Sequence, residues 1–119
     1  MAARPRRPLI LHLFVLAFTL AACQAGSAAS PADGPPLTGV TEVDAKDLKF
    51  LPPVIQVQPG TEVTWRFVDG SVPHNVDGDG FVSRNQSRGT FSHRFTSPGE
   101  YRYRCTLHAG MDGRVVVAG

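Results

Sequence analysis

The sequence predicts a small all-β domain, a sandwich or barrel built from antiparallel strands. From Val40 onward, apolar residues recur at alternate positions, as they do in strands with one buried face. Pro-Gly and Asp-Gly pairs, which are typical of turns, separate these apolar runs. No stretch after Val40 combines the 3.6-residue period of an amphipathic helix with capping residues. These three observations together favour an antiparallel β-sandwich over any helical fold.

The first two strands of the pattern are expected at residues 54–58 (VIQVQ) and 62–67 (EVTWRF). In the second of these, Val63, Trp65 and Phe67 occupy alternate positions and therefore share one face. Polar residues lie between them, so we expect this face to line the core.

Three further strands are expected at 90–96 (TFSHRFT), 101–105 (YRYRC) and 113–119 (GRVVVAG). In the first of them, His93 shares a face with two phenylalanines, which favours a packed or edge histidine over a metal ligand. In the second, Cys105 shares a face with two tyrosines, so its sulfur should point inward at one end of the sandwich.

The N-terminus reads as a leader rather than as part of the fold. Arginines are followed by an apolar run from Leu9 to Ala22, which is too short for an ordinary spanning helix and typical of a secretory signal. The run ends in LAAC, which resembles the lipobox of bacterial lipoproteins. That resemblance implies cleavage before Cys23, a lipid on its sulfur, and an extracytoplasmic protein anchored to a bacterial membrane on its periplasmic or cell-surface side. The alternative is an ordinary signal followed by a chance cysteine.

We therefore divide the chain into a lipoprotein signal peptide (1–22), a lipidated cysteine with a flexible linker (23–39) and a folded domain (40–119). The linker sequence is rich in small residues and proline and has no hydrophobic period. The stability of a domain of about 80 residues is marginal, so a bound metal that stabilises the fold would be unsurprising.

The charge of the chain changes when the leader is removed. Three of the twelve Lys and Arg residues lie within 1–22 and none of the ten acidic residues does, so the formal net charge falls from +2 to −1. This balance excludes a basic nucleic-acid-binding surface.

The segment CTLHAGM, residues 105–111, places three possible soft-metal ligands three residues apart: Cys105, His108 and Met111. If Cys23 carries a lipid, Cys105 has no disulfide partner, and a lone thiol outside the cytoplasm needs another role. A loop after the tryptophan strand supplies His74. One thiolate, two imidazoles and a thioether form the donor set of blue-copper electron-transfer sites.

Each of these residues also has a structural alternative. Cys105 could be a buried thiol, His74 a turn residue, and Met111 a core side chain. Their combination in one pattern favours the metal site.

At these residues the chain resembles the cupredoxin (blue copper) family, of the amicyanin and plastocyanin kind. The short Cys-x-x-His-x-x-Met spacing resembles that of the amicyanin branch. The other matching segments are 50–52 (FLP), 58–65 (QPGTEVTW), 73–76 (PHNV), 97–105 (SPGEYRYRC) and 110–117 (GMDGRVVV). The resemblance implies a Greek-key β-sandwich that holds one type 1 copper ion through His74, Cys105, His108 and Met111.

The sequence departs from this family at one position near the site. Many members carry Trp-x-Asn, and the Asn side chain holds the backbone beside the copper cysteine. Here Phe67 occupies that position, so we expect another residue to hold the ligand loop, or a looser loop.

Three functions fit a cupredoxin-like chain: carrying single electrons between redox partner proteins, buffering or delivering copper, and a metal-free interaction role. Beyond the two ligand histidines the mature chain has only His93, too few donors for a catalytic copper centre, so we do not expect an enzyme. A single thiolate and a single methionine outside the leader favour holding copper over exchanging it. We expect a monomeric electron carrier that binds no nucleic acid.

Overall fold

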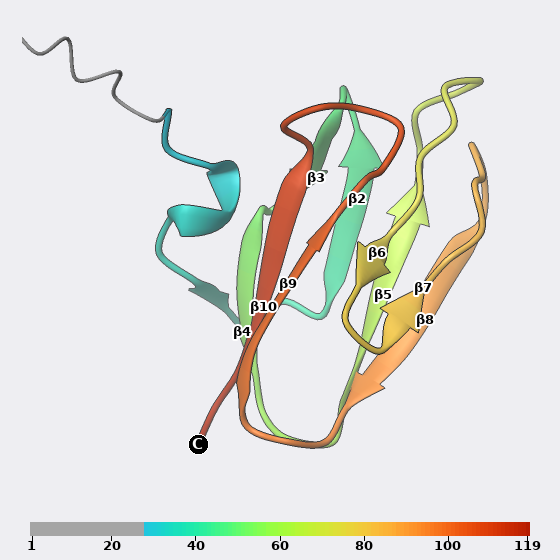
Figure 1. Cartoon of the computed structure of the whole chain (residues 1–119). Helices are drawn as coiled ribbons and strands as arrows, with labels where there is room; N and C mark the ends of the chain where they lie inside the picture. Colours follow the sequence, from blue (N-terminus) through green and yellow to red (C-terminus); the bar gives the residue numbers. More distant parts are fainter. Residues whose placement is uncertain (1–27) are drawn as a thin grey trace, which may run out of the picture.

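The computed structural model describes residues 28–119, which form two facing β-sheets (Figure 1). The predicted signal peptide and Cys23 lie outside the described residues. The elements, in chain order, are η1 (Pro31–Asp33, a 3-10 helix), β1 (Leu37–Thr38), β2 (Glu42–Lys46), β3 (Lys49–Leu51), β4 (Val54–Val57), β5 (Thr61–Phe67), β6 (Asp77–Gly78), β7 (Phe81–Val82), β8 (Thr90–Phe95), β9 (Gly99–Arg104) and β10 (Asp112–Val117). Within this part of the chain, no helix has the length and apolar character needed to cross a membrane.

One sheet has six strands in the order β1-β4-β10-β9-β6-β7, and the other has four in the order β3-β2-β5-β8. The prediction of an all-β sandwich is confirmed. The pairing is mixed, however, because β4 lies parallel to both β1 and β10, and β2 lies parallel to β5. The parallel pairs arise because the chain leaves one sheet after β3, forms β4 in the other, and returns in β5.

The core forms around Trp65, which is fully buried. Its ring contacts Tyr103 edge-on at a centroid distance of 5.2 Å and stacks on Phe81 at 5.8 Å. Burial of each such side chain contributes roughly 1.5–3 kcal/mol. Tyr103 needs a glycine beside it on β10, since a Cβ at Gly113 would lie 2.3 Å from the tyrosine ring carbon Cζ. Burial raises the pKa of the Tyr103 hydroxyl, which therefore stays protonated.

The prediction of a flexible linker as far as Gly39 is wrong for its second half. Ser30 caps η1: its hydroxyl accepts a hydrogen bond from the Ala32 amide, and its own amide donates to the Asp33 carboxylate. Ala32 is 1% exposed, and β1 pairs with β4. The segment is ordered because its polar groups have partners and Ala32 is buried against the sheet.

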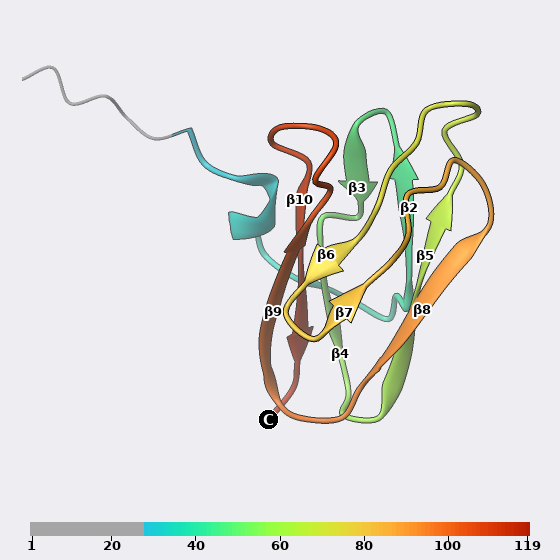
Figure 2. The ribbon, with the colours of Figure 1, turned by 45° about the vertical axis from the view of Figure 1, so that its right-hand side comes forward.

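Four connections meet at one end of the sandwich, which we call the loop end (Figures 1 and 2). They are the turns or loops β2–β3, β5–β6, β7–β8 and β9–β10. The β4–β5 and β8–β9 connections lie at the opposite end. The residues predicted to bind metal all belong to connections at the loop end.

Candidate metal centre

Three predicted ligands come together at the loop end. The ligand atoms of His74, Cys105 and His108 all lie within 4.8 Å of one another. His74 comes from the β5–β6 loop, and the other two from the β9–β10 loop. His74 and Cys105 are buried, whereas His108 is only half-buried. The site is thus closed on its inner side and reaches the surface at His108.

The β9–β10 loop is closed by its own backbone. The Cys105 amide donates to the Met111 carbonyl at 2.9 Å, and the Met111 amide donates to the His108 carbonyl at 3.3 Å. Met111 is 1% exposed and belongs to the hydrophobic core cluster. The loop therefore ends with Met111 buried in the core, and the role of Met111 as a fourth ligand remains a prediction.

Hydrogen bonds determine which ring nitrogen of each histidine keeps a lone pair for a metal ion. Nε2 of His74 lies 2.8 Å from the Asp69 carboxylate, and Nε2 of His108 lies 3.0 Å from the Pro73 carbonyl. Both acceptors lack a proton to give, so each Nε2–H donates and each Nδ1 keeps a free lone pair. Two Nδ1 atoms and one thiol sulfur are the donors that a copper ion prefers.

The buried Nδ1 of His74 supports this arrangement. Within residues 28–119 this atom has no hydrogen-bond partner and no access to water. An unpaired buried polar atom is costly in a folded protein and calls for an explanation. Coordination of a metal ion at this lone pair supplies one, so the residues present fit a copper ion.

Asp69 links the predicted ligand His74 to the β2–β3 turn. Its carboxylate accepts hydrogen bonds from His74 and from the backbone amide of Asp47. The bond from His74 is the main reason why the pKa of Asp69 lies below its ordinary value. Asp47 and Leu48 both have positive φ angles, 53° and 57°, which are unfavourable for such residues. The carboxylate therefore orients a ligand and stabilises a strained turn.

Replacing Asp69 by alanine is expected to lower copper affinity about 10–100-fold, the usual effect of losing a partner that orients a metal-bound histidine. Asp69→Asn keeps an acceptor oxygen and should recover part of that affinity. Competition titration with a chelator of known affinity measures both variants. As a control, Asp79→Asn changes an exposed carboxylate in the β6–β7 turn. Unchanged affinity in Asp69→Ala would show that the hydrogen bond does not position His74.

Asn75 provides the hold on the ligand loop that Phe67 cannot provide. Its side-chain oxygen accepts from the Thr106 amide at 2.8 Å, and its Nδ2 donates to the Thr106 hydroxyl at 2.7 Å. Nδ2 also donates to the Asn85 side chain at 2.9 Å. Phe67 is instead buried in the core. The only sign of this role in the sequence is an asparagine directly after the predicted ligand His74.

Backbone pairing fixes the loop that carries His74, and aromatic packing fixes His93. His74 and Gln86 exchange both backbone hydrogen bonds, at 3.0 and 2.9 Å, which fixes the β5–β6 loop against the β7–β8 loop. His93 lies outside the cluster, as predicted. Its ring stacks on Phe81 at a centroid distance of 5.0 Å and contacts Phe95 edge-on at 4.8 Å.

Comparison with known proteins gives several relatives. The family model for copper binding proteins of the plastocyanin/azurin family matches residues 37–118. Amicyanin-alpha of Methylorubrum extorquens is 35% identical over 121 aligned residues, covering 93% of this chain and 98% of that protein. Amicyanin of Paracoccus denitrificans is 34% identical over 87 residues, which is 66% of each chain.

Solved structures agree with the sequence relatives. The Cu(I) form of an amicyanin variant superposes with a TM-score of 0.60 and 31% identity, covering 75% of this chain and 90% of that one. A purple cupredoxin from Nitrosopumilus maritimus superposes with a TM-score of 0.56 and 27% identity, covering 66% of this chain and all of that one. The donor cluster, the two-sheet fold and these matches lead to one conclusion: the chain belongs to the plastocyanin/azurin family of copper-binding proteins, the cupredoxins.

Proposed function

We propose that the protein is a blue copper electron carrier that works outside the cytoplasm and passes single electrons between redox partner proteins. His74, Cys105 and His108 hold the ion, with Met111 as a weaker fourth ligand. The observation that carries the proposal is the convergence of one thiol and two oriented imidazoles within 4.8 Å. A bound copper ion supplies a reversible one-electron change at such a site.

The arrangement favours electron transfer over copper delivery. Cys105 and His74 are buried, and Asp69 holds the His74 ring in place. Pro73 does the same for His108, and Asn75 ties the ligand loop to the β5–β6 loop. Because each ligand is held by burial or by a hydrogen bond, the site needs little rearrangement when the charge of the ion changes. A protein that hands copper on would need donors that separate easily.

His108 is the route by which an electron would enter or leave. It is the one ligand of the clustered three that is not fully buried. Its neighbour Leu107 is 41% exposed, and the residues Ala109 and Gly110 are small and exposed. A partner can therefore approach the ring edge closely at the loop end.

Voltammetry and a chelator challenge test the proposed function together. An electron carrier should give a reversible one-electron wave and should keep its copper against a mild chelator. Copper lost within minutes, with no reversible wave, would instead support a buffering or delivery role. This outcome would contradict electron transfer without contradicting copper binding.

Met111→Leu is expected to keep the blue colour and raise the reduction potential. Leucine removes the weak thioether donor, which stabilises Cu(II) more than Cu(I), while filling a similar volume in the core. Voltammetry of the wild-type and variant proteins measures the change. A potential unchanged in the variant would mean that Met111 serves only in packing.

The proposed membrane anchor depends on Cys23 and has its own test. Cys23→Ala is expected to abolish acylation and to move the protein from the detergent phase to the aqueous phase. Intact mass and detergent partitioning of the wild type and the variant measure this directly. A wild-type protein without acyl mass that partitions into water would refute the anchor and leave the copper site untouched.

A further inference from the structure

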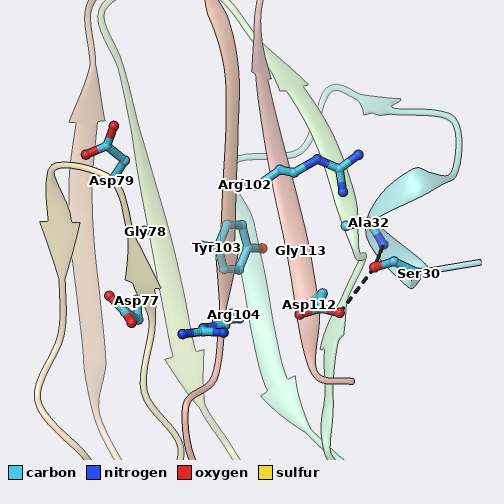
Figure 3. A pocket seen from close by; sticks show the side chains of 10 residues that line it. All are labelled: Ser30, Ala32, Asp77, Gly78, Asp79, Arg102, Tyr103, Arg104, Asp112 and Gly113. Atoms are coloured by element: carbon cyan, nitrogen blue, oxygen red, sulfur yellow. Dashed lines mark hydrogen bonds between the residues drawn. The ribbon is translucent and has the colours of Figure 1, made fainter. Parts of the chain in front are cut away.

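The segment 30–38, which we call the strap, ends in β1, which pairs with β4, and is also tied to the six-stranded sheet by three polar contacts made by side chains. The Ser30 hydroxyl donates to the Asp112 carboxylate at 3.2 Å (Figure 3). Asp33 pairs with Arg102 at 2.7 Å, and the Arg114 guanidinium donates to the Gly34 carbonyl at 2.9 Å.

Packing adds to these contacts. Ala32 is 1% exposed, and the side chain of Arg114 is only 11% exposed. Ser30 and Ala32 form one wall of a surface cleft of about 420 Å³, whose other walls come from β9, β10, β6 and the turn after β6 (Figure 3). An exposed ion pair alone contributes about 0–1 kcal/mol, but a helix cap adds about 1 kcal/mol. The strap is therefore a docked element.

The strap starts at the loop end. Its first contact, Asp112, directly follows the predicted ligand Met111 in the chain. From there the strap continues into β1, which lies parallel to β4 and leads away from the loop end (Figure 1). The chain before Ser30 must therefore join the head beside the metal centre.

This exit point limits where the head can lie relative to the proposed lipid. Cys23 is seven residues before Ser30. Seven residues span at most roughly 25 Å when fully extended. Without the docked strap, the first strand residue would be Glu42, nineteen residues after Cys23. In that case the chain would enter the head at the end opposite the loop end, where β2 begins. The nineteen residues between the lipid and the head could then span roughly 65 Å.

A head standing on its far end would need the tether almost fully stretched. Strand β10 alone is six residues long, or roughly 20 Å at 3.3 Å per residue, and the β8–β9 turn extends beyond it. Ser30 would then lie about as far from the membrane as seven residues can reach. A stretched tether loses conformational entropy, so this orientation is disfavoured.

We propose that the strap holds the copper-binding end of the domain toward the membrane that carries the anchor. The inference rests on the lipid proposed at Cys23. In this orientation His108 lies near the bilayer surface, and the redox partner that it meets is a protein held in or on the same membrane. Release of the strap would free the head to turn and to meet partners in solution.

Energy transfer to the bilayer measures this orientation. A fluorescent unnatural amino acid is placed at the loop end, in place of Ser71, or at the far end, in place of Ser97, both of them exposed. The full chain is bound to vesicles that contain an acceptor lipid. We expect a greater loss of donor fluorescence from position 71 than from position 97. A greater loss from position 97 would overturn the proposal.

The double variant Ser30→Ala, Asp33→Ala removes the helix cap and two of the three polar contacts. It should reduce the difference between the two label positions, while hydrogen exchange over residues 30–38 becomes faster. Glu62→Ala is the matched control, since it removes an exposed carboxylate that pairs with Arg94 at 3.7 Å on the other sheet. If the double variant keeps its strap docked, Ala32→Asp places a charge in the buried position and releases it.

The proposal would be contradicted if the difference in fluorescence loss between positions 71 and 97 stayed unchanged in a variant whose strap shows fast hydrogen exchange. Intact mass separates this failure from a failure of the anchor. If the mass shows no lipid on Cys23, a thiol-reactive lipid in the vesicles is coupled to that cysteine, and the orientation is measured in the same way. The position of the head is thus obtained whether or not cells acylate the chain.

Electron exchange gives a second readout of the partner class. A lipid bearing an oxidised ferrocene accepts one electron from the copper-loaded, reduced protein and becomes the neutral ferrocene. The wild type should react faster with this lipid than the strap-released variant does. Both proteins should react equally fast with ferricyanide in solution. Equal rates with the lipid would contradict a partner held at the membrane.

Discussion

Replacing Cys105 by serine is expected to abolish the intense absorption band at about 600 nm that a Cu(II)–thiolate site of this kind gives. A hydroxyl oxygen is a poor donor for copper and cannot reproduce the charge transfer from sulfur. The fold should survive, because serine is nearly isosteric and the residue 105 amide can still donate to the Met111 carbonyl. Absorption spectra of the copper-loaded protein and circular dichroism measure the two effects.

The other cysteine provides a matched control. Cys23→Ser changes the cysteine proposed to carry the lipid, which is not among the predicted ligands, and should leave the band unchanged. A blue Cys105→Ser protein would show that the assignment of the thiolate ligand is wrong.

Asn75→Ala is expected to weaken both the fold and the hold on copper. It leaves the Thr106 amide without its side-chain acceptor in a partly buried hydrogen bond, a loss of about 0.5–1.5 kcal/mol. The ligand loop would then be free to move away from His74, which should lower copper affinity about 10–100-fold. Thermal unfolding of the metal-free protein and a competition titration separate the two contributions.

Asn85→Ala is the control for this variant. It removes one acceptor of the Asn75 Nδ2 group but leaves both bonds to Thr106. Its effect on copper affinity should be much smaller. Equal effects of the two variants would mean that the β7–β8 loop, rather than the bond to the ligand loop, accounts for the loss.

Long runs with a clear period of two could be predicted from the sequence. The runs at 54–58, 62–67, 90–96, 101–105 and 113–119 correspond to β4, β5, β8, β9 and β10. Strands β2 and β3 carry several charges and are joined by a turn at Asp47 and Leu48 that lacks the expected glycine. Strands β6 and β7 have two residues each, too few for any period to show.

The candidate ligands Cys105, His108 and Met111 could be proposed because their spacing within one loop is local, whereas His74 lies on a separate loop. Asp69 and Asn75 could not be assigned roles, because each acts on a group that the fold brings near, such as the Asp47 amide or the Thr106 amide. The strap was missed for the same reason. Its composition is that of a linker, and its order depends on contacts with β10 and on Arg102, 69 positions away from Asp33.

Titration of the metal-free protein with Cu(II), followed by absorption and electron paramagnetic resonance, tests the central claim most directly. We expect one equivalent of copper to bind, with an intense band at about 600 nm and the small hyperfine splitting of a copper–thiolate site. Binding of several weak equivalents, or a single site without the intense band, would contradict a blue copper centre formed by His74, Cys105 and His108.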